Sequence, residues 1–502
     1  MKPQHLARLL GLLLLGPCCV AATAGTLVVS STAPALNASN VARNTAIVVN
    51  FDRAVQTASV TESTLRVWGW SGGRTPTTRA WSNGDQTLTI TPTRSFFPGE
   101  RVTVNLAAAI TAVDGSPLRA GGYTLQFLTR AGVASANFTL IDTVTVRTSP
   151  GVTTRLYGGA FPDLNDDGWI DYVAVNEVSG DLRVLMNRAD GSGLVHPVLQ
   201  PPRAIGLEAS PNEAVDFNHD GRIDMATSNT SSSSVSIVLG NGNGTFQPQQ
   251  EIPVGNSPHG LAALDVDGDA DLDLVAASFG SNNLSRLLNN GSGVFGAATS
   301  FDSGGNGEYP LAAGDMDNDG LTDLVVGTRN DQQVHVLRNN GNGTFTRVFN
   351  GPVGGLTWMI AVGDVNNDGN LDVSSVNGQS NSAAILLGTG TGALGAPAST
   401  GNLGGTLIAT DLGDLDGDGD LDWVLSSYSA ARWFLRSNNG AGVFSAAGEI
   451  PAPQSGSCGS LYDFDNDGDL DLGLADELED VVLLLRNGPA VPPLFANGFE
   501  SP

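Results

Sequence analysis

A nine-residue acidic segment, Asp-x-(Asp/Asn)-x-Asp-(Gly/Ala)-x-x-Asp, occurs seven times between Asp163 and Asp471. The first aspartates of successive copies lie 49 to 53 residues apart. A repeat of nearly constant length is typical of one supersecondary unit that is copied and stacked. In a β-rich sequence, units of about 50 residues are the blades of a β-propeller, which close into a ring. The spacing therefore predicts an all-β chain with a seven-bladed β-propeller, one blade for each copy.

The spacing within the segment predicts a calcium loop. Oxygen atoms at positions 1, 3 and 5 of a tight turn converge on one point, and a carboxylate at position 9 closes the cage. A hard cation prefers such oxygen ligands, so we expect up to seven Ca²⁺ ions, one per blade. The predicted ligands, loop by loop, are Asp163, Asn165, Asp167 and Asp171; Asp216, Asn218, Asp220 and Asp224; Asp265, Asp267, Asp269 and Asp273; Asp315, Asp317, Asp319 and Asp323; Asp364, Asn366, Asp368 and Asp372; Asp414, Asp416, Asp418 and Asp422; and Asp463, Asp465, Asp467 and Asp471.

Charge excludes some classes of partner. Asp and Glu number 51 against 24 Lys and Arg, which gives a formal net charge of −27. An acidic surface repels the phosphates of nucleic acids and the headgroups of anionic membranes. We therefore expect neither as a partner. The sequence makes no prediction of the oligomeric state.

The N-terminus predicts export. Lys2 and Arg8 precede an apolar run, and small residues at positions 22–24 form a cleavage site, so residues 1–24 read as a secretory signal peptide. No later stretch reaches the 18 apolar residues that a transmembrane span needs. A lipoprotein signal at Cys18 and Cys19 is the alternative, although Pro17 fits it poorly. We expect a bacterial protein that is secreted, periplasmic or associated with the cell surface, with Cys458 as its one remaining cysteine.

Residues 25–131 predict a separate β-sandwich, because short β-rich runs alternate there with Asn, Gly and Pro turns. The segment resembles the bacterial Ig-like domain. The matching positions are Pro34, Asn40, Val41, Phe51, Thr91, Pro92, Pro98, Gly99, Asp114, Gly115 and Phe127. The resemblance implies a spacer that presents the propeller.

The propeller is expected to span residues 132–490, followed by a C-terminal tail at 491–502. The seventh repeat lacks its last strand, because Asn487-Gly488 runs straight into a Pro-rich end. A matching β-type segment, from Asn137 to Val146, stands before the first repeat. We infer that this segment completes the last blade and so closes the ring.

The seven loops resemble the FG-GAP and VCBS repeats of integrin α-subunit propellers and of many bacterial secreted proteins. The resemblance implies that each metal loop joins the first two strands of its blade, on the face opposite the ligand-binding face. One loop departs from the pattern: Ala270 stands where the other six have glycine. Because alanine resists a sharp bend, we expect somewhat weaker ion binding in the third loop.

The opposite face then becomes the candidate ligand site. The residues six positions before each first aspartate are Tyr157, Ser210, His259, Tyr309, Trp358, Ile408 and Ser457. If each inner strand begins there, these residues surround the mouth of the central channel. Aromatic rings and hydroxyl groups suit the recognition of a sugar or a peptide. We predict ligand contacts at Tyr157, Ser210, His259, Tyr309 and Trp358. In the alternative interpretation these side chains merely pack adjacent blades together.

Catalytic motifs are absent from the sequence, with no zinc motif of the His-Glu-x-x-His type and no Gly-x-Ser-x-Gly elbow. We therefore predict no catalytic residue. The favoured function is that of a calcium-binding adhesion or ligand-binding protein, whose partner is a glycan or an extracellular or cell-surface protein. The alternative is a carbohydrate-active enzyme, a lyase or hydrolase with its site at the channel mouth, for which His259 or Glu308 are possible acid–base groups.

Overall fold

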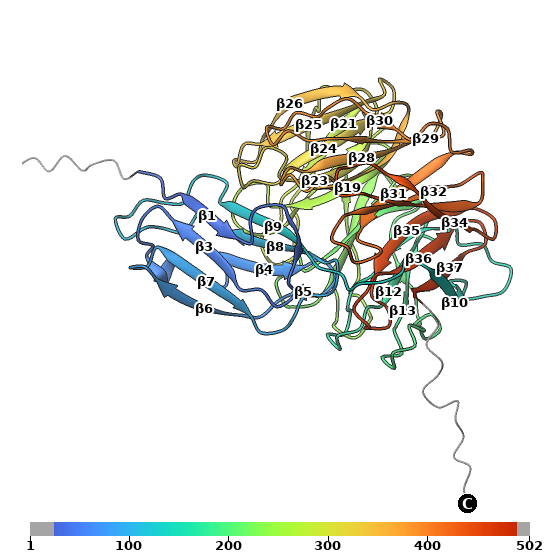
Figure 1. Cartoon of the computed structure of the whole chain (residues 1–502), viewed down its shortest axis with the longest axis horizontal. Helices are drawn as coiled ribbons and strands as arrows, with labels where there is room; N and C mark the ends of the chain where they lie inside the picture. The colour runs from blue at the N-terminus through green and yellow to red at the C-terminus, as the bar shows by residue number, and fades with distance from the viewer. Residues whose placement is uncertain (1–24, 489–502) are drawn as a thin grey trace, which may run out of the picture.

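The computed structural model describes residues 25–488, so the predicted signal peptide at 1–24 and the tail at 491–502 lie outside the described residues. Within this range the regular structure is β, apart from one 3₁₀ turn, η1 (Thr57–Ser59). None of the described segments forms a helix long and apolar enough to cross a membrane. Figure 1 shows a narrow N-terminal domain in blue against a broad ring of sheets that runs from green to red.

The N-terminal domain is a sandwich of two sheets. Buried and half-buried residues alternate along its strands, as in β3 with Ile47, Val49 and Phe51 inside, and the two inner faces form one apolar core. The first sheet has the order β1 (Val29–Ala33), β3 (Ile47–Phe51), β7 (Thr87–Pro92), β6 (Thr77–Ser82). The second has the order β2 (Ala38–Val41), β9 (Tyr123–Thr129), β8 (Arg101–Leu106), β4 (Leu65–Gly69), β5 (Gly73–Arg74).

Seven four-stranded antiparallel sheets follow, and they are the blades of a propeller. Their strands, from the channel outward, are β11 (Leu156–Ala160), β12 (Tyr172–Asn176), β13 (Asp181–Leu185) and β14 (Arg203–Ala204); β15 (Ala209–Val215), β16 (Asp224–Asn229), β17 (Ser234–Val238) and β18 (Gln250–Pro253); β19 (Pro258–Leu264), β20 (Asp273–Ser278), β21 (Asn283–Leu287) and β22 (Thr299–Phe301); β23 (Glu308–Gly314), β24 (Asp323–Thr328), β25 (Gln333–Asn339) and β26 (Phe345–Pro352); β27 (Thr357–Gly363), β28 (Asp372–Asn377), β29 (Ser382–Leu386) and β30 (Ala398–Ser399); β31 (Leu407–Gly413), β32 (Asp422–Ser427), β33 (Arg432–Ser437) and β34 (Ser445–Pro451); and β35 (Gly456–Tyr462), β36 (Asp471–Asp476), β37 (Val481–Asn487) and β10 (Phe138–Thr145).

The ring closes through the first strand of the propeller region. Strand β10 pairs antiparallel with β37, from Phe138 opposite Asn487 to Thr145 opposite Val481. Figure 1 shows β10 beside β37, although the two strands lie at opposite ends of the repeat region. The seventh blade therefore takes its outer strand from the N-terminal side, as the sequence predicts, and the pairing joins the two ends of the ring.

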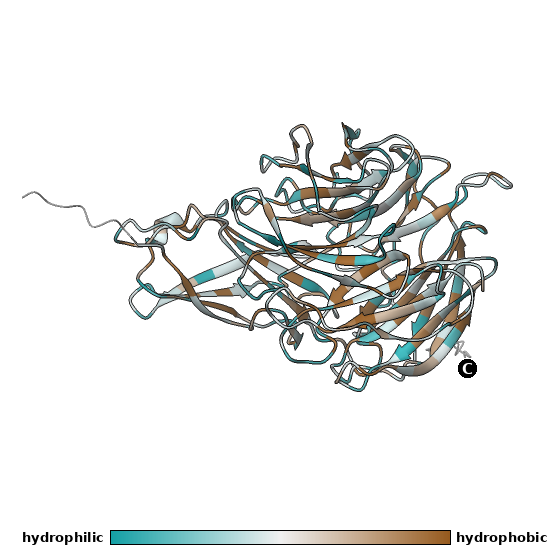
Figure 2. Cartoon of the chain, turned by 90° about the horizontal axis from the view of Figure 1, so that it is seen from above, coloured by the Kyte–Doolittle hydropathy of each residue, from teal (hydrophilic) through white to brown (hydrophobic). Residues whose placement is uncertain are grey.

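The blades are held together by apolar packing between neighbouring sheets. The second strand of every blade is buried along its whole length, as expected of a strand covered on both faces. Phe217 of the second loop and Phe295 of the third blade meet edge to face, with centroids 5.3 Å apart. Figure 2 shows apolar stretches along the strands of both domains. This packing fixes the blades as a rigid frame for the loops at their ends.

Candidate metal loops and channel mouth

Each acidic loop joins the first and second strands of its blade, so all seven loops lie on one face of the propeller. The backbone of the loop folds around its own carboxylates. In the fourth loop, Asp315 accepts hydrogen bonds from the amides of Asp319 and Gly320. Asp323, at position 9, accepts from the amides of Met316 and Asn339. These bonds hold both ends of the loop around one centre.

Carboxylate oxygens converge in four of the loops, where three side-chain ligand atoms lie within 4.8 Å of one another. The four groups are Asp265, Asp267 and Asp269; Asp315, Asp317 and Asp323; Asp414, Asp416 and Asp422; and Asp463, Asp465 and Asp471. The other three loops carry asparagine at position 3, and its amide nitrogen donates to the carboxylate at position 5, as from Asn165 to Asp167 at 2.9 Å. Several of the acidic clusters can therefore hold a metal ion.

Burial disfavours the ionised form of these carboxylates unless a positive charge lies close by. Burial raises the pKa of Asp265 to about 8, and the neighbouring charge of Asp269 adds to the effect. Burial likewise raises the pKa of Asp224 to about 8 and that of Asp323 to about 9. A divalent cation bound by these oxygens would lower the pKa values again, because it stabilises the ionised carboxylates. The donor set, all oxygen and strongly anionic, fits Ca²⁺ better than a metal that prefers nitrogen or sulfur.

Position 6 of the loop requires a left-handed backbone. The glycine there has φ of 79° in the fourth loop and 83° in the fifth, at Gly320 and Gly369. Ala270 adopts the same conformation, with φ of 73°, although it carries a Cβ. The third loop therefore keeps its shape, at the conformational cost that an L side chain meets in this region.

The Ig-like domain packs against the face of the propeller that carries the acidic loops. Here the structure differs from the spacer that the sequence predicts: the domain and the linker after it contact all seven loops. The contacts, in loop order, join Ser71 to Asp163, Gly73 to Ile223, Ala108 to Gly268, Thr124 to Gly320, Ser39 to Asn367, Ala134 to Asp416 and Gly132 to Gly468. Of these, five are hydrogen bonds between backbone groups, and four of the five accept at a loop carbonyl. The domain is a cap on this face.

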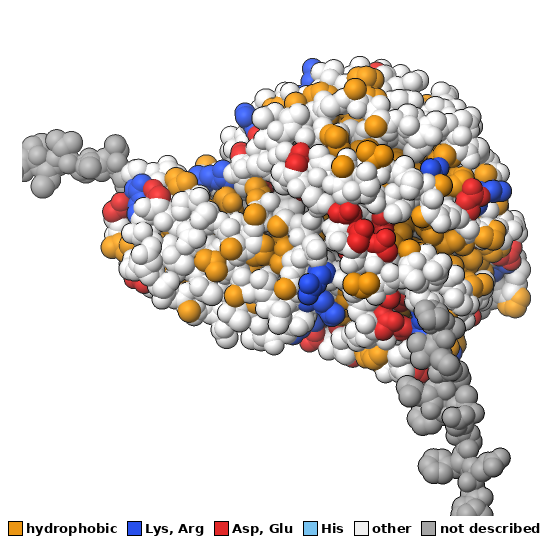
Figure 3. All heavy atoms as spheres, in the orientation of Figure 1, with side chains coloured by type: hydrophobic (Ala, Val, Ile, Leu, Met, Phe, Trp, Pro, Cys, Tyr) orange, Lys and Arg blue, Asp and Glu red, His pale blue; other side chains and the backbone are white. Residues whose placement is uncertain are grey.

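Charges and apolar side chains strengthen the cap. Figure 3 shows basic atoms beside acidic atoms along the junction of the two domains. Arg66 pairs with Asp271 at 3.1 Å and Arg94 with Asp166 at 3.5 Å. Both aspartates occupy loop positions that are not predicted ligands, whereas Arg119 lies 3.8 Å from the predicted ligand Asp319. Trp68 belongs to the same buried apolar cluster as Phe217 of the second loop.

At the other face, four of the predicted mouth residues form one connected cluster. The Tyr157 hydroxyl lies 3.0 Å from His259 Nε2, and the Trp358 indole N–H donates to that hydroxyl at 3.4 Å. The His259 ring stacks on Tyr309, with centroids 3.7 Å apart. The cluster joins blades 1, 3, 4 and 5, so Tyr157 reaches across the channel mouth. Burial lowers the pKa of His259 to about 3, with a further contribution from the Arg329 charge.

The three remaining predicted positions occupy the same place in their inner strands but do not join the aromatic cluster. Ser210, Ile408 and Ser457 are buried at the second position of their inner strands. The Ser457 hydroxyl donates to the Tyr157 carbonyl at 2.6 Å, which is a link between blades 7 and 1. The packing interpretation therefore describes Ser457, and the ligand contact at Ser210 stays a prediction. The other proposed acid–base group, Glu308, is buried and accepts from the Ser303 hydroxyl at 2.6 Å.

A second ring of residues, which sequence reasoning missed, surrounds the same mouth. Its members follow the second strand of each blade and stand fourteen residues after the first loop aspartate. They are Glu177, Thr230, Phe279, Arg329, Gly378, Tyr428 and Glu477. The fixed distance from each loop was visible in the sequence and could have identified them.

Arg329 of this ring sits among aromatic rings. Its guanidinium carbon lies 4.3 Å from the centroid of Tyr309 and 4.4 Å from that of Trp358, with Phe279 at 5.6 Å. Such cation–π contacts hold a guanidinium in place while they leave its N–H groups available. Within residues 25–488, Arg329 forms no ion pair with a carboxylate. It is therefore a fixed donor group beside the aromatic cluster.

Two glutamates of the second ring share one arginine. Arg155 Nε lies 2.6 Å from Glu477 Oε1 and 3.1 Å from Glu177 Oε2. Burial raises the pKa of Glu177 to about 7, and the Glu477 charge raises it further. The mouth thus combines an aromatic half that carries Arg329 with an acidic half centred on Arg155.

Comparison with family models matches both parts of the chain. A bacterial Ig-like domain model matches residues 24–129. An FG-GAP-like repeat model matches six overlapping windows, at 163–227, 216–276, 265–326, 315–375, 364–425 and 414–474, which together span most of the chain. The chain belongs to the FG-GAP-like repeat family. Each FG-GAP window spans two successive loops, so the six windows include all seven.

Comparison with solved structures finds propellers of low sequence identity. BBS1N, solved in complex with ARL6DN, is 11% identical with a TM-score of 0.52, over 72% of this chain and 99% of its own. Virginiamycin B lyase from Staphylococcus aureus is 12% identical with a TM-score of 0.47, over 70% and 99%. At 11% identity, the similarity to BBS1N shows the fold alone. Among curated proteins, none matches this chain.

Proposed function

We propose that this FG-GAP protein is a secreted, calcium-binding adhesion or ligand-binding protein. Its propeller recognises a glycan or an extracellular or cell-surface protein at the channel mouth, on the face opposite the acidic loops. The signal-like residues 1–24 support export, and the net charge of −27 argues against nucleic acid and anionic membrane as partners. The Ig-like domain caps the calcium-loop face and leaves the mouth free for a partner.

The observation that carries this proposal is the cluster of Tyr157, His259, Tyr309, Trp358 and Arg329. Binding sites in proteins combine aromatic surface with a few fixed polar groups. Here the rings fix one another by stacking and hydrogen bonds, and they fix Arg329 as well. A preorganised cluster loses little conformational entropy when a ligand binds. The mouth therefore has the apolar surface and the donors that a glycan or a peptide requires.

Calcium has a structural role in this proposal. The carboxylates of the seven loops would hold the ions, and a bound ion supplies the positive charge that their burial demands. The loops in turn carry the carbonyls on which the Ig-like domain docks. Calcium would thus stabilise the propeller and its cap together.

A double variant at the mouth tests the ligand site. Binding of the wild type and of Tyr309→Ala, Trp358→Ala would be compared on arrays of glycans and of extracellular proteins, in calcium. We expect the variant to lose binding to the wild type's ligand by at least about tenfold, since buried aromatic anchors dominate binding energy. Val443→Ala, at an exposed residue of an outer hairpin, is the matched control. Unchanged affinity in the double variant would remove the cluster from the site.

One observation favours a second function, that of a carbohydrate-active enzyme. Glu177 and Glu477 both contact Arg155 Nε, so two of their oxygens lie within about 6 Å of each other, which is compatible with the carboxyl spacing of retaining glycosidases. The pKa of Glu177, raised to about 7, suits a general acid. Cleavage of a bound glycan by the wild type, abolished in Glu177→Gln while binding persists, would establish this function. Glycan binding without any product would exclude it.

A further inference from the structure

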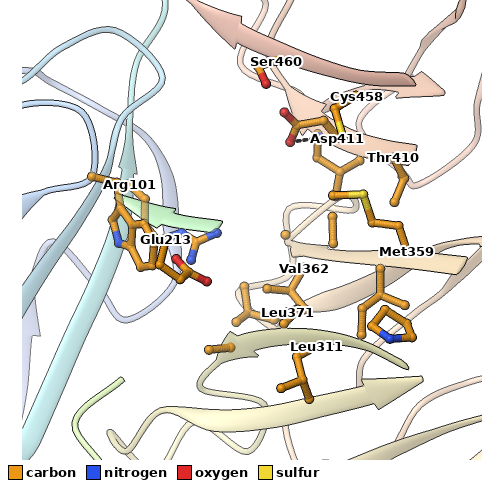
Figure 4. A pocket seen from close by; sticks show the side chains of 18 of the residues that line it. Arg101, Glu213, Leu311, Met359, Val362, Leu371, Thr410, Asp411, Cys458 and Ser460 are labelled. Carbon is orange, nitrogen blue, oxygen red and sulfur yellow. Dashed lines mark hydrogen bonds between the residues drawn. The ribbon is translucent and has the colours of Figure 1, made fainter. Parts of the chain in front are cut away.

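The channel of the propeller contains an internal chamber of about 320 Å³. All seven inner strands contribute to its wall. The Ig-like domain supplies its floor through Trp70, Arg101, Gln126 and Leu128, and the mouth cluster supplies its roof. Figure 4 shows Arg101 and Glu213 next to each other on one side, and Asp411, Thr410, Cys458 and Ser460 on the other. The chamber is therefore composite: neither domain forms it alone.

Arg101 brings unsatisfied donors into this space. Its guanidinium carbon lies 4.7 Å from the Trp70 ring centroid, which supports it from one side. Its side chain makes no hydrogen bond to any described group, although it lies deep in the molecule. A guanidinium carries five N–H donors, and buried donors are satisfied by a partner. These donors face the chamber, so its contents must accept them.

Two carboxyl groups present hydrogen-bond acceptors to a ligand in the chamber. Glu213 lies on β15 and Asp411 on β31, and both line the chamber. Each is far from bulk solvent, yet each keeps part of its surface uncovered by protein, because that surface faces the chamber. The Asp411 carboxylate accepts one backbone hydrogen bond, from Leu412, and its other oxygen is free of described donors. Burial raises the pKa of Glu213 to about 8 and that of Asp411 to about 7.

Apolar side chains form another part of the wall. Leu311, Met359, Val362 and Leu371 line the side between the two polar groups (Figure 4). A wall of this kind can cover the C–H face of a compact molecule while polar groups at the rim bind its hydroxyls. The volume corresponds to roughly ten water molecules at about 30 Å³ each, and it lies at the lower end of the range for ligand pockets.

We propose that the chamber is a binding site for a small, neutral, polyhydroxylated molecule of the size of a mono- or disaccharide. Its hydroxyls donate to Glu213 and Asp411 and accept from Arg101. Arg101 repels a cation, and the two carboxyl groups repel an anion once they are ionised above their raised pKa values, so a neutral ligand avoids both repulsions. The inference rests on the proposed function only in the choice of a carbohydrate. Because Tyr157 bonds to His259 across the mouth, access from that face requires this contact to open.

Isothermal titration of the full mature chain in calcium at pH 9, where both carboxyl groups are ionised, tests this site. The probes are D-glucose, D-galactose, N-acetyl-D-glucosamine and lactose, with D-galacturonate as the anionic counterpart of galactose. Glu213→Gln and Asp411→Asn keep the shape of each side chain and alter its hydrogen bonding, and a thermal melt checks that each variant folds. We expect at least one neutral sugar to bind, and each variant to weaken it by about tenfold or more.

Three outcomes would overturn the proposal: no neutral sugar binds, binding is unchanged in both variants, or D-galacturonate binds more tightly than D-galactose. The proposal of a ligand site at the channel mouth is tested independently of the chamber. If Tyr309→Ala, Trp358→Ala abolishes binding on the arrays while small sugars fail to bind, the mouth remains the ligand site and the chamber is not one. If the small sugars depend on Glu213 and Asp411 but the arrays show no ligand, the chamber stands without the mouth.

Discussion

The side-chain amide of Asn187, in the first blade, donates a hydrogen bond to the backbone carbonyl of Phe464, in the last, at 2.8 Å. The same amide donates to the Ile170 carbonyl at 3.0 Å. Asparagines at the equivalent place of other blades repeat this link, as Asn289 does to Phe217. Where the ring closes, the link joins the first acidic loop to the seventh, next to the pairing of β10 with β37.

We predict that Asn187→Ala lowers the free energy of unfolding by about 2 kcal/mol. The change removes two buried hydrogen bonds that Asn187 donates and one that it accepts from the Ala189 amide, and it leaves two carbonyl groups without their donors. Chemical denaturation in calcium measures the effect. Asn243→Ala is the control, because Asn243 is exposed and bonds only within its own turn, and it should change stability by less than about 0.5 kcal/mol. Equal effects of the two changes would contradict a closing role for Asn187.

The third loop offers a test of backbone strain. Ala270→Gly should stabilise the protein by about 1 kcal/mol, because glycine adopts the left-handed conformation at φ of 73° without steric cost. The reverse change in the fifth loop, Gly369→Ala, should destabilise by a similar amount. An added Cβ at Gly369 meets nothing within 4 Å, so this change isolates the conformational cost. Loss of stability in Ala270→Gly would show that contacts of the buried methyl group outweigh the strain.

Buried His259 should make stability depend on pH. Its pKa is about 3 in the folded protein, whereas an unfolded histidine titrates near 6.5. The unfolded chain therefore binds more protons between these values, so stability falls as pH drops below about 6.5, by about 2 kcal/mol at pH 5. Tyr157, Tyr309 and Arg329 face this ring, and none of them is an acid that could offset the loss.

His259→Gln removes this titration while it keeps a side chain that can bond to Tyr157. The stability of the variant and of the wild type would be compared in calcium at pH 8 and pH 5. The difference between the two proteins should shift by about 2 kcal/mol in favour of the variant on going to pH 5. A pH-independent difference would mean that His259 takes up a proton in the folded state as easily as in the unfolded state.

Calcium and the docking of the Ig-like domain should be coupled. The backbone amides of Ala108 and Thr124 donate to the loop carbonyls of Gly268 and Gly320, at 2.8 and 2.7 Å. If chelation loosens the loops, these two amides should exchange with solvent at least about tenfold faster, while the Val104 amide inside β8 stays protected. Hydrogen exchange with mass spectrometry measures both. Equal protection of Ala108 and Thr124 with and without chelator would show that the docking of the Ig-like domain does not depend on calcium.

The sequence predicts much of this fold because each loop repeats the same local chemistry. The period predicts seven blades, and the gap after Asn487 predicts that the segment around Phe138 completes the last one. The position of the Ig-like domain leaves no such signal, because Ala108 and Thr124 dock through backbone groups that any residue provides. Tertiary contacts of this kind do not depend on side-chain pattern.

The mouth was predicted in part. Counting back from each loop identifies Tyr157, His259, Tyr309 and Trp358, because every inner strand begins at the same distance before its first loop aspartate. It cannot show that Tyr157 crosses the channel. Counting fourteen residues forward from Asp315, the first aspartate of the fourth loop, also identifies Arg329. The chamber could not be predicted from the repeats, since Arg101 comes from the other domain.

The central claim, that the seven acidic loops are calcium sites which stabilise the propeller, is tested most directly by thermal unfolding of residues 25–502 in 10 mM calcium and in excess chelator, with a count of bound ions. We predict close to seven ions per chain and a large fall in the melting temperature on chelation. Each site with a dissociation constant of about 0.1 to 1 mM would contribute roughly 1 to 3 kcal/mol under these conditions. No bound ion and an unchanged melting temperature would contradict the account.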